Sequence, residues 1–185
     1  WLIHLFPDAA VEPAVREYLA RNEGMFKDLA TAPEGAFIGH QSAYLIQYAG
    51  LMRFKDLQPF LEPNFKKSEP GGNEKRSAAM WVMALLHEKD PVPGLTKSFI
   101  ERLADRSGMM PEQSEIRRMS AIALGILRAK SAALGLIEAY QLDPADSVIP
   151  DSSRWSLGMI GEQIPDPTKA FPAAIGGWKL NPIGD

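Results

Sequence analysis

The sequence predicts an all-α fold, and three observations support this prediction. Clusters of proline and glycine interrupt the chain repeatedly, at 31–35, 69–72, 91–94, 108–111, 143–151 and 165–167. The segments between them run for about 12 to 20 residues, with apolar residues at helical spacing and few β-branched residues. No segment alternates apolar and polar residues over a convincing strand length. We therefore expect helices joined by loops.

Three segments show the spacing of single helices most clearly, over 8–20, 97–106 and 129–141. The first begins at Asp8, a residue type that caps helix N-termini. Their apolar positions are Val11, Val15 and Leu19 in the first segment, Phe99, Ile100 and Leu103 in the second, and Leu134, Ile137 and Leu142 in or just beyond the third.

Length and composition describe one folded domain or a short run of repeats. Hydrophobic residues make up 45% of the 185 residues and charged residues 23%, as in ordinary folded proteins. The net charge of -3 gives no general attraction to nucleic acid or anionic lipid, so neither partner is expected. The absence of cysteine excludes disulfides and thiolate metal sites and suits a cytoplasmic protein, although many exported domains lack cysteine too.

No apolar run approaches the length of a membrane-spanning helix. The chain begins at Trp1, without an initiator Met or a signal-peptide pattern. We interpret it as a piece of a longer protein and leave its localisation open.

One segment carries the clearest repeat signature, and it reads IRRMSAIALGIL over 116–127. It resembles the second helix of a HEAT repeat, whose pattern is roughly V-R-x-x-A-A-x-A-L-G-x-I-G. The match covers nearly every informative position, with Ser120 for the first Ala and Arg128 for the last Gly. The related families include the HEAT-like repeats of phycobilin lyases. In this pattern, the arginine that matches Arg117 bonds a loop between repeats.

Weaker copies occur at 38–50, 75–83 and 156–161, the last matching only the A-L-G-x-I-G end. Aligning Ala43, Ala79, Ala121 and Arg154 gives steps of 36, 42 and 33 residues, which suit HEAT-type units. The resemblance thus implies a HEAT-like α-solenoid of about four helix pairs. We expect this repeat domain over residues 1–162, with atypical N-terminal helices in 1–37.

The last segment, 163–185, differs from the rest because it is rich in proline and glycine. It also carries the apolar residues Phe171, Ile175, Trp178 and Leu180. Such a segment cannot form a long helix, yet it is too apolar for a solvated linker. We expect an extended tail that caps the last helices.

Small residues in the repeat predict close helix contacts. Glycine destabilises a helix interior by about 1 kcal/mol relative to alanine. Gly125 and Gly158 therefore indicate positions where a neighbouring element approaches closely.

No pattern of catalytic or metal-binding residues is found. His4, His40 and His87 lie in no metal-binding pattern, and the acidic residues read as helix-start or loop charges. Phosphate-binding loops and nucleophile elbows are missing too. The basic pairs at 66–67, 75–76 and 117–118 are short and have acidic neighbours, so they do not predict nucleic-acid binding. We predict no catalytic residue, metal or cofactor.

The repeat alignment predicts a binding surface instead. The unconstrained positions of the pattern recur every four residues, so they share one face of each second helix. In HEAT stacks the second helices line the concave side. The residues of this face that we select as binding residues are Tyr44, Tyr48, Met80, Arg118, Ile122, Trp155 and Met159. We expect a face this apolar to be buried. It is covered either by a helix or peptide of a partner, or by another part of the same protein such as the 171–180 tail.

Three functions are compatible with this pattern. The first is a non-enzymatic protein-interaction or scaffold domain of a larger protein, which uses the apolar concave face to bind a protein, a peptide or another domain. The second is a HEAT-like enzyme of the bilin lyase or DNA glycosylase type, with its ligand in that groove. The third is an architectural spacer. A pocket with convergent polar groups would favour the enzyme, and a long open groove the scaffold.

Overall fold

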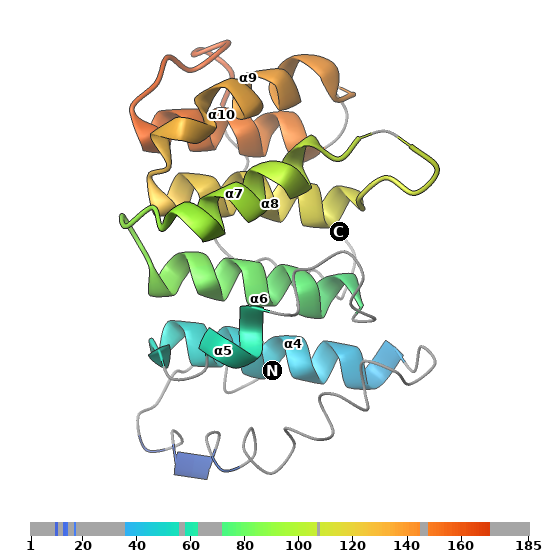
Figure 1. Ribbon diagram of the computed structural model, residues 1–185, viewed down its shortest axis with the longest axis vertical. Helices are drawn as coiled ribbons and strands as arrows, with labels where there is room; N and C mark the ends of the chain where they lie inside the picture. The colour runs from blue at the N-terminus through green and yellow to red at the C-terminus, as the bar shows by residue number, and fades with distance from the viewer. Residues whose placement is uncertain are drawn as a thin grey trace. The chain divides into compact units, whose positions relative to one another are not determined.

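The computed structural model describes residues 10, 13–14, 17, 36–55, 58–62, 72–106, 108–144 and 148–170. All regular secondary structure in these ranges is helical (Figure 1), so the predicted all-α fold is confirmed. Most of the predicted helix over 8–20 lies outside the described residues, as does the tail over 171–185. None of the helices described is both long enough and apolar enough to cross a membrane.

The chain divides into two compact units, an N-terminal unit over 1–86 and a C-terminal unit over 87–185. The N-terminal unit contains α4 (Ala36–Leu51), the short α5 (Gln58–Leu61) and α6 (Asn73–Leu86). Helices α4 and α6 lie side by side (Figure 1). A Cβ atom on Gly50 would lie 2.5 Å from Cγ2 of Val82, so only glycine permits this approach of the two helices.

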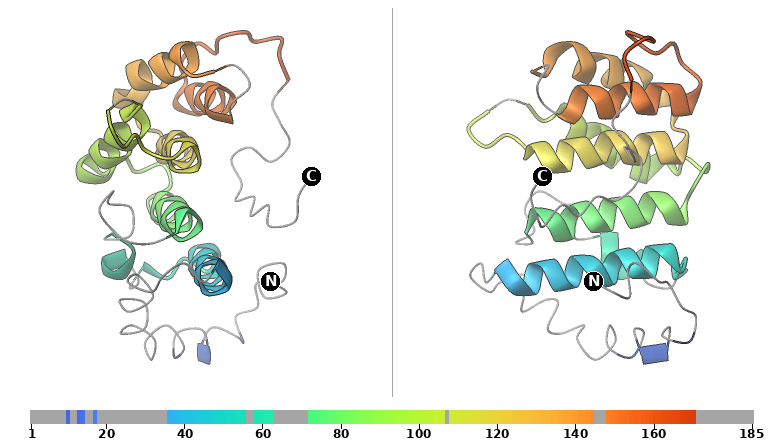
Figure 2. Two further views of the ribbon diagram at one scale, coloured as in Figure 1. Left: turned by 90° about the vertical axis from the view of Figure 1, so that its right-hand side faces the viewer. Right: turned by 180° about the vertical axis from the view of Figure 1, so that it is seen from behind.

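The C-terminal unit contains two helix pairs. These are α7 (Pro93–Ala104) with α8 (Ser114–Leu127), and α9 (Ala133–Leu142), which follows the 3-10 turn η4 (Lys130–Ala132), with α10 (Val148–Ile160). Within each pair the helices pack together, and α8 also packs on α10 and α7 on α9. Figure 2 shows α7 and α9 in one layer and α8 and α10 in the other. The second pair therefore stacks on the first in the same order.

The longer helices end at regular intervals along the chain. The last residues of α4, α6, α8 and α10 are Leu51, Leu86, Leu127 and Ile160, at intervals of 35, 41 and 33 residues. These intervals agree to within one residue with the steps of the sequence alignment. Regular helix ends are shared by several families of helical repeats.

The end of α8 explains one departure from the repeat pattern. Arg128, which stands where the pattern has glycine, adopts a left-handed conformation with φ of 59°. Its backbone N–H donates to the carbonyls of Gly125 and Leu124, and its guanidinium donates to the carbonyl of Met159. Glycine adopts this conformation more easily than arginine, and Gly161 does so at the end of α10.

The apolar face of α7 was predicted correctly and that of α9 was not. Of the three predicted positions in α7, Phe99 and Leu103 are buried and Ile100 is partly exposed. In α9 the buried residues are Leu136 and Ala139, whereas 76% of Leu134 and 64% of Leu142 are exposed. Helix α9 carries apolar residues on more than one side, and the stripe that includes the small Ala139 packs inward, because small side chains allow closer helix contact.

Candidate functional site

Helices α8 and α10 cross closely at Gly125. A Cβ atom on Gly125 would lie 2.6 Å from Oγ and 2.9 Å from Cβ of Ser156, and 2.8 Å from Cζ3 of Trp155. The Ser156 hydroxyl also donates to the carbonyl oxygen of Ala121 at 2.7 Å. The predicted tight crossing at Gly125 is therefore confirmed.

Four of the predicted binding residues lie along this crossing. Arg118 and Ile122 share one stripe of α8 with Gly125, because residues three or four apart lie on the same side of a helix. Trp155, whose ring lies over Gly125, shares a stripe of α10 with Met159. We call these residues, Arg118, Ile122, Gly125, Trp155 and Met159, the α8–α10 seam. Ile122 is fully buried, while Arg118, Trp155 and Met159 are partly exposed.

Arg118 differs from the other arginines of the C-terminal unit. Within the described part of the chain its guanidinium has no hydrogen bond and no ion pair. Burial lowers the pKa of Arg118 from its ordinary value, yet arginine stays protonated at neutral pH. The remaining arginines have carboxylate or carbonyl partners: Arg102 with Asp105 and Glu112, Arg106 with Glu138, Arg117 with Asp143, Arg128 with Met159, and Arg154 with Asp151.

The adjacent Arg117 has a structural role. Its Nε donates to the carbonyl of Leu103 at 2.9 Å, and its Nη1 and Nη2 donate to the two carboxylate oxygens of Asp143 at 2.5 and 2.6 Å. Leu103 belongs to α7, and Asp143 directly follows α9. Arg117 thus joins the C-terminal ends of α7 and α9, and this structural role is the one expected for it from the sequence.

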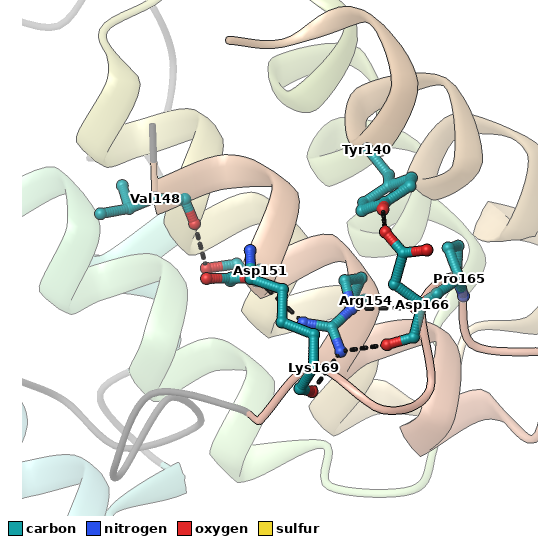
Figure 3. A network of polar contacts seen from close by, with 8 residues as sticks. Tyr140, Val148, Asp151, Arg154, Pro165, Asp166 and Lys169 are labelled. Carbon is teal, nitrogen blue, oxygen red and sulfur yellow. Dashed lines mark hydrogen bonds and ion pairs between the residues drawn. The ribbon is translucent and has the colours of Figure 1, made fainter. Parts of the chain in front are cut away.

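Arg154 is the centre of a second structural network, which sequence reasoning missed (Figure 3). The residue is completely buried. Its Nε donates to the carbonyl of Pro165 at 3.0 Å, and its Nη2 donates to the carbonyls of Asp166 at 2.9 Å and Lys169 at 2.6 Å. Its Nη1 lies 3.1 Å from Oδ1 of Asp151. The serines around Arg154 in the sequence were the available signal, since small neighbours allow other segments to enclose a side chain.

These bonds hold residues 161–170, the return segment, against the last helix pair. Lys169 Nζ lies 3.0 Å from Asp151 Oδ1 in the first turn of α10, so the segment runs back along that helix. Tyr140 of α9 donates to the carboxylate of Asp166 (Figure 3). A Cβ atom on Gly158 would lie 2.8 Å from Cδ1 of Ile164. The close contact predicted at Gly158 is therefore confirmed, and the element that makes it is this segment and not another helix.

The other predicted binding residues belong to the N-terminal unit. Tyr48 is only 1% exposed, and its ring packs edge-on to Phe54 with centroids 6.4 Å apart. Met80 is fully buried, and Tyr44 is partly exposed. The continuity of the predicted strip from these residues to the α8–α10 seam stays a prediction.

An open depression of about 540 Å³ lies elsewhere in the C-terminal unit. It is lined by Pro91, Pro93, Thr96, Lys97, Ile100, Glu101, Arg128, Lys130 and Ser131, none of them a predicted binding residue. Lys97 and Glu101 approach each other to 4.0 Å. The lining offers no nucleophile paired with a base. Across the described residues, no group of three or more His, Asp or Glu side chains is placed to hold a metal ion.

Comparison with known proteins adds no family. No protein-family model, curated protein or solved structure matches this chain.

Proposed function

We propose that this chain is a protein-interaction or scaffold domain of HEAT-like architecture, without enzymatic activity, in a larger protein. Its partner binds at the α8–α10 seam. The observation that carries this proposal is the partly buried Arg118, which has no partner among the described residues and lies on α8, next to the helix α10 that carries the partly exposed Trp155 and Met159.

Two physical arguments support this proposal. Tryptophan, methionine and arginine are enriched where proteins bind one another, and tryptophan and arginine often dominate the binding energy. A guanidinium that has lost part of its hydration without gaining a partner is destabilising, so an anion that reaches it is bound favourably. The open depression near Pro91 has no convergent catalytic groups, which favours a scaffold over an enzyme that encloses its ligand.

The proposal is tested with a display library of random twelve-residue peptides, selected on the immobilised full chain. We expect peptides to be retained and Trp155→Ala to weaken their binding at least tenfold, because truncating a central aromatic residue typically costs 2 kcal/mol or more, roughly a 30-fold loss. Leu134→Ala is the control, since it shortens an apolar residue that is exposed on α9, away from the seam. If no peptide is retained, or if Trp155→Ala and Leu134→Ala act alike, the seam is not the binding surface.

A further inference from the structure

The unpaired arginine defines the chemistry of a partner for the seam. Asp151 is the acidic residue of α10 that the 33-residue alignment step places level with Arg118. Its carboxylate is already bound by Arg154 at 3.1 Å and Lys169 at 3.0 Å. Arg118 therefore has no carboxylate on the described part of the seam, so a carboxylate that pairs with it must come from outside.

The positions of Arg118 and Trp155 set the spacing of the partner's contacts. Arg118 precedes Gly125, where the Trp155 ring lies, by seven residues, which is about 10 Å along the helix axis. Side chains on a helix lean towards its N-terminus, so the guanidinium lies somewhat farther from the indole ring. An extended peptide advances about 3.3 Å per residue and alternates its side chains. Two side chains on one side of it, four residues apart, are about 13 Å apart and match this separation.

We propose that the seam binds an extended, acidic segment of a partner protein. An Asp or Glu carboxylate of that segment pairs with Arg118, and an apolar side chain four residues away packs against Trp155 and Met159. The guanidinium suits a carboxylate because its planar fork can donate two parallel hydrogen bonds. This inference rests on the proposed function and specifies its partner.

A nucleic acid fits the same seam poorly. A phosphate backbone presents one charge per nucleotide, and its binding strength grows with the number of cations that contact it. The described seam offers one unpaired guanidinium, and the whole chain carries a net charge of -3. A peptide that carries a carboxylate and, four residues away, an apolar side chain uses both chemical features of the seam.

The peptides selected on the full chain test the inference. We expect an Asp or Glu to be enriched four residues from an apolar residue. Arg118→Gln should weaken the best peptide by about tenfold to hundredfold, as expected when a charge-assisted hydrogen bond is lost. Arg118→Lys should retain part of the affinity, because lysine keeps the charge but not the fork. Arg106→Gln is the matched control, since Arg106 bonds the carbonyl of Glu138 and lies off the seam.

The possible outcomes separate this inference from the proposed function. If the peptides lack a fixed acidic position, or bind Arg118→Gln as tightly as the parent, the acidic partner is wrong. The proposed function survives that result if Trp155→Ala still weakens binding. Both fail if no peptide is retained. Binding of a twenty-residue oligothymidine that requires Arg118, with no acidic peptide selected, would also overturn the inference. If circular dichroism shows that Arg118→Gln is unfolded, the affinity of Arg118→Lys for the same peptide is the deciding measurement.

Discussion

The crossing of α8 and α10 at Gly125 can be tested by adding a single methyl group. In Gly125→Ala the new Cβ would lie 2.6 Å from Ser156 Oγ and 2.9 Å from Ser156 Cβ, well inside van der Waals contact. The Trp155 ring, at 2.8 Å, can tilt because Cζ3 is the far end of its side chain. Ser156 Cβ is fixed to the backbone of α10, so the two helices must separate.

Two effects of opposite sign determine the size of the change. Alanine favours a helix over glycine by about 1 kcal/mol. Overpacking a well-packed contact destabilises by about 1–3 kcal/mol. We expect Gly125→Ala to lower the free energy of unfolding by up to about 2 kcal/mol, measured by urea denaturation. At about 2–4 °C per kcal/mol for a chain of this size, the melting temperature should fall by several degrees.

A matched control isolates the contact from helix propensity. Gly135 lies inside α9, and a Cβ atom there would meet nothing within 4 Å. Gly135→Ala should therefore raise the free energy of unfolding by up to about 1 kcal/mol. Ser156→Gly in the Gly125→Ala background should remove the clash and show positive coupling in a double-mutant cycle. If Gly125→Ala stabilises the protein as much as Gly135→Ala does, the crossing is not tight and the seam is wrongly placed.

Three further substitutions test contacts within the C-terminal unit. Asp143→Asn should destabilise by about 3–5 kcal/mol in urea denaturation, because it leaves the buried Arg117 without its carboxylate; an unchanged midpoint would contradict the bridge. Ile122→Glu should abolish the cooperative thermal transition, because a carboxylate at this fully buried site would lose its hydration. A folded variant would show that Ile122 is accessible to solvent. The hydrogen bond to Asp166 raises the pKa of Tyr140, so its stabilisation is complete below about pH 10 and is lost as the pH rises through the raised value. Tyr140→Phe should remove that dependence from alkaline unfolding curves, and identical curves would refute it.

The sequence alone predicted the structure correctly at positions where the local apolar pattern and the tertiary packing agree. The helical spacing of Phe99 and Leu103 predicted the buried face of α7. Gly125 predicted a close crossing, because an interior glycine lowers helix stability unless a neighbour needs the space. In α9, Leu134 and Leu136 are equally apolar, and only the packing against neighbouring helices decides which of them is buried.

Local sequence patterns could not predict the contacts between segments that are far apart in the sequence. The sequence places Arg154 in a helix, but its partners are carbonyl groups at 165, 166 and 169. Nothing in residues 163–170 marks which carbonyls face an arginine, because every residue carries one. The close contact at Gly158 was predicted, but its neighbour could not be named for the same reason, since Ile164 reaches it only after the chain has turned back.

The pair Arg117 and Arg118 shows how the fold separates two residues of identical chemistry. Successive residues of a helix point about 100° apart, so the two side chains cannot meet the same surroundings. Arg117 points to the ends of α7 and α9, where Asp143 and a carbonyl satisfy it, and there its charge maintains the stacking of the two helix pairs. Arg118 lies on the stripe of α8 that includes Gly125, and the described residues provide no anion for it there. A protein that needed only a stable stack would gain nothing from a charge at that position, because an apolar side chain there would avoid the loss of hydration. This difference between neighbours supports the proposal that Arg118 binds a partner, whereas the contacts of Arg117 are structural.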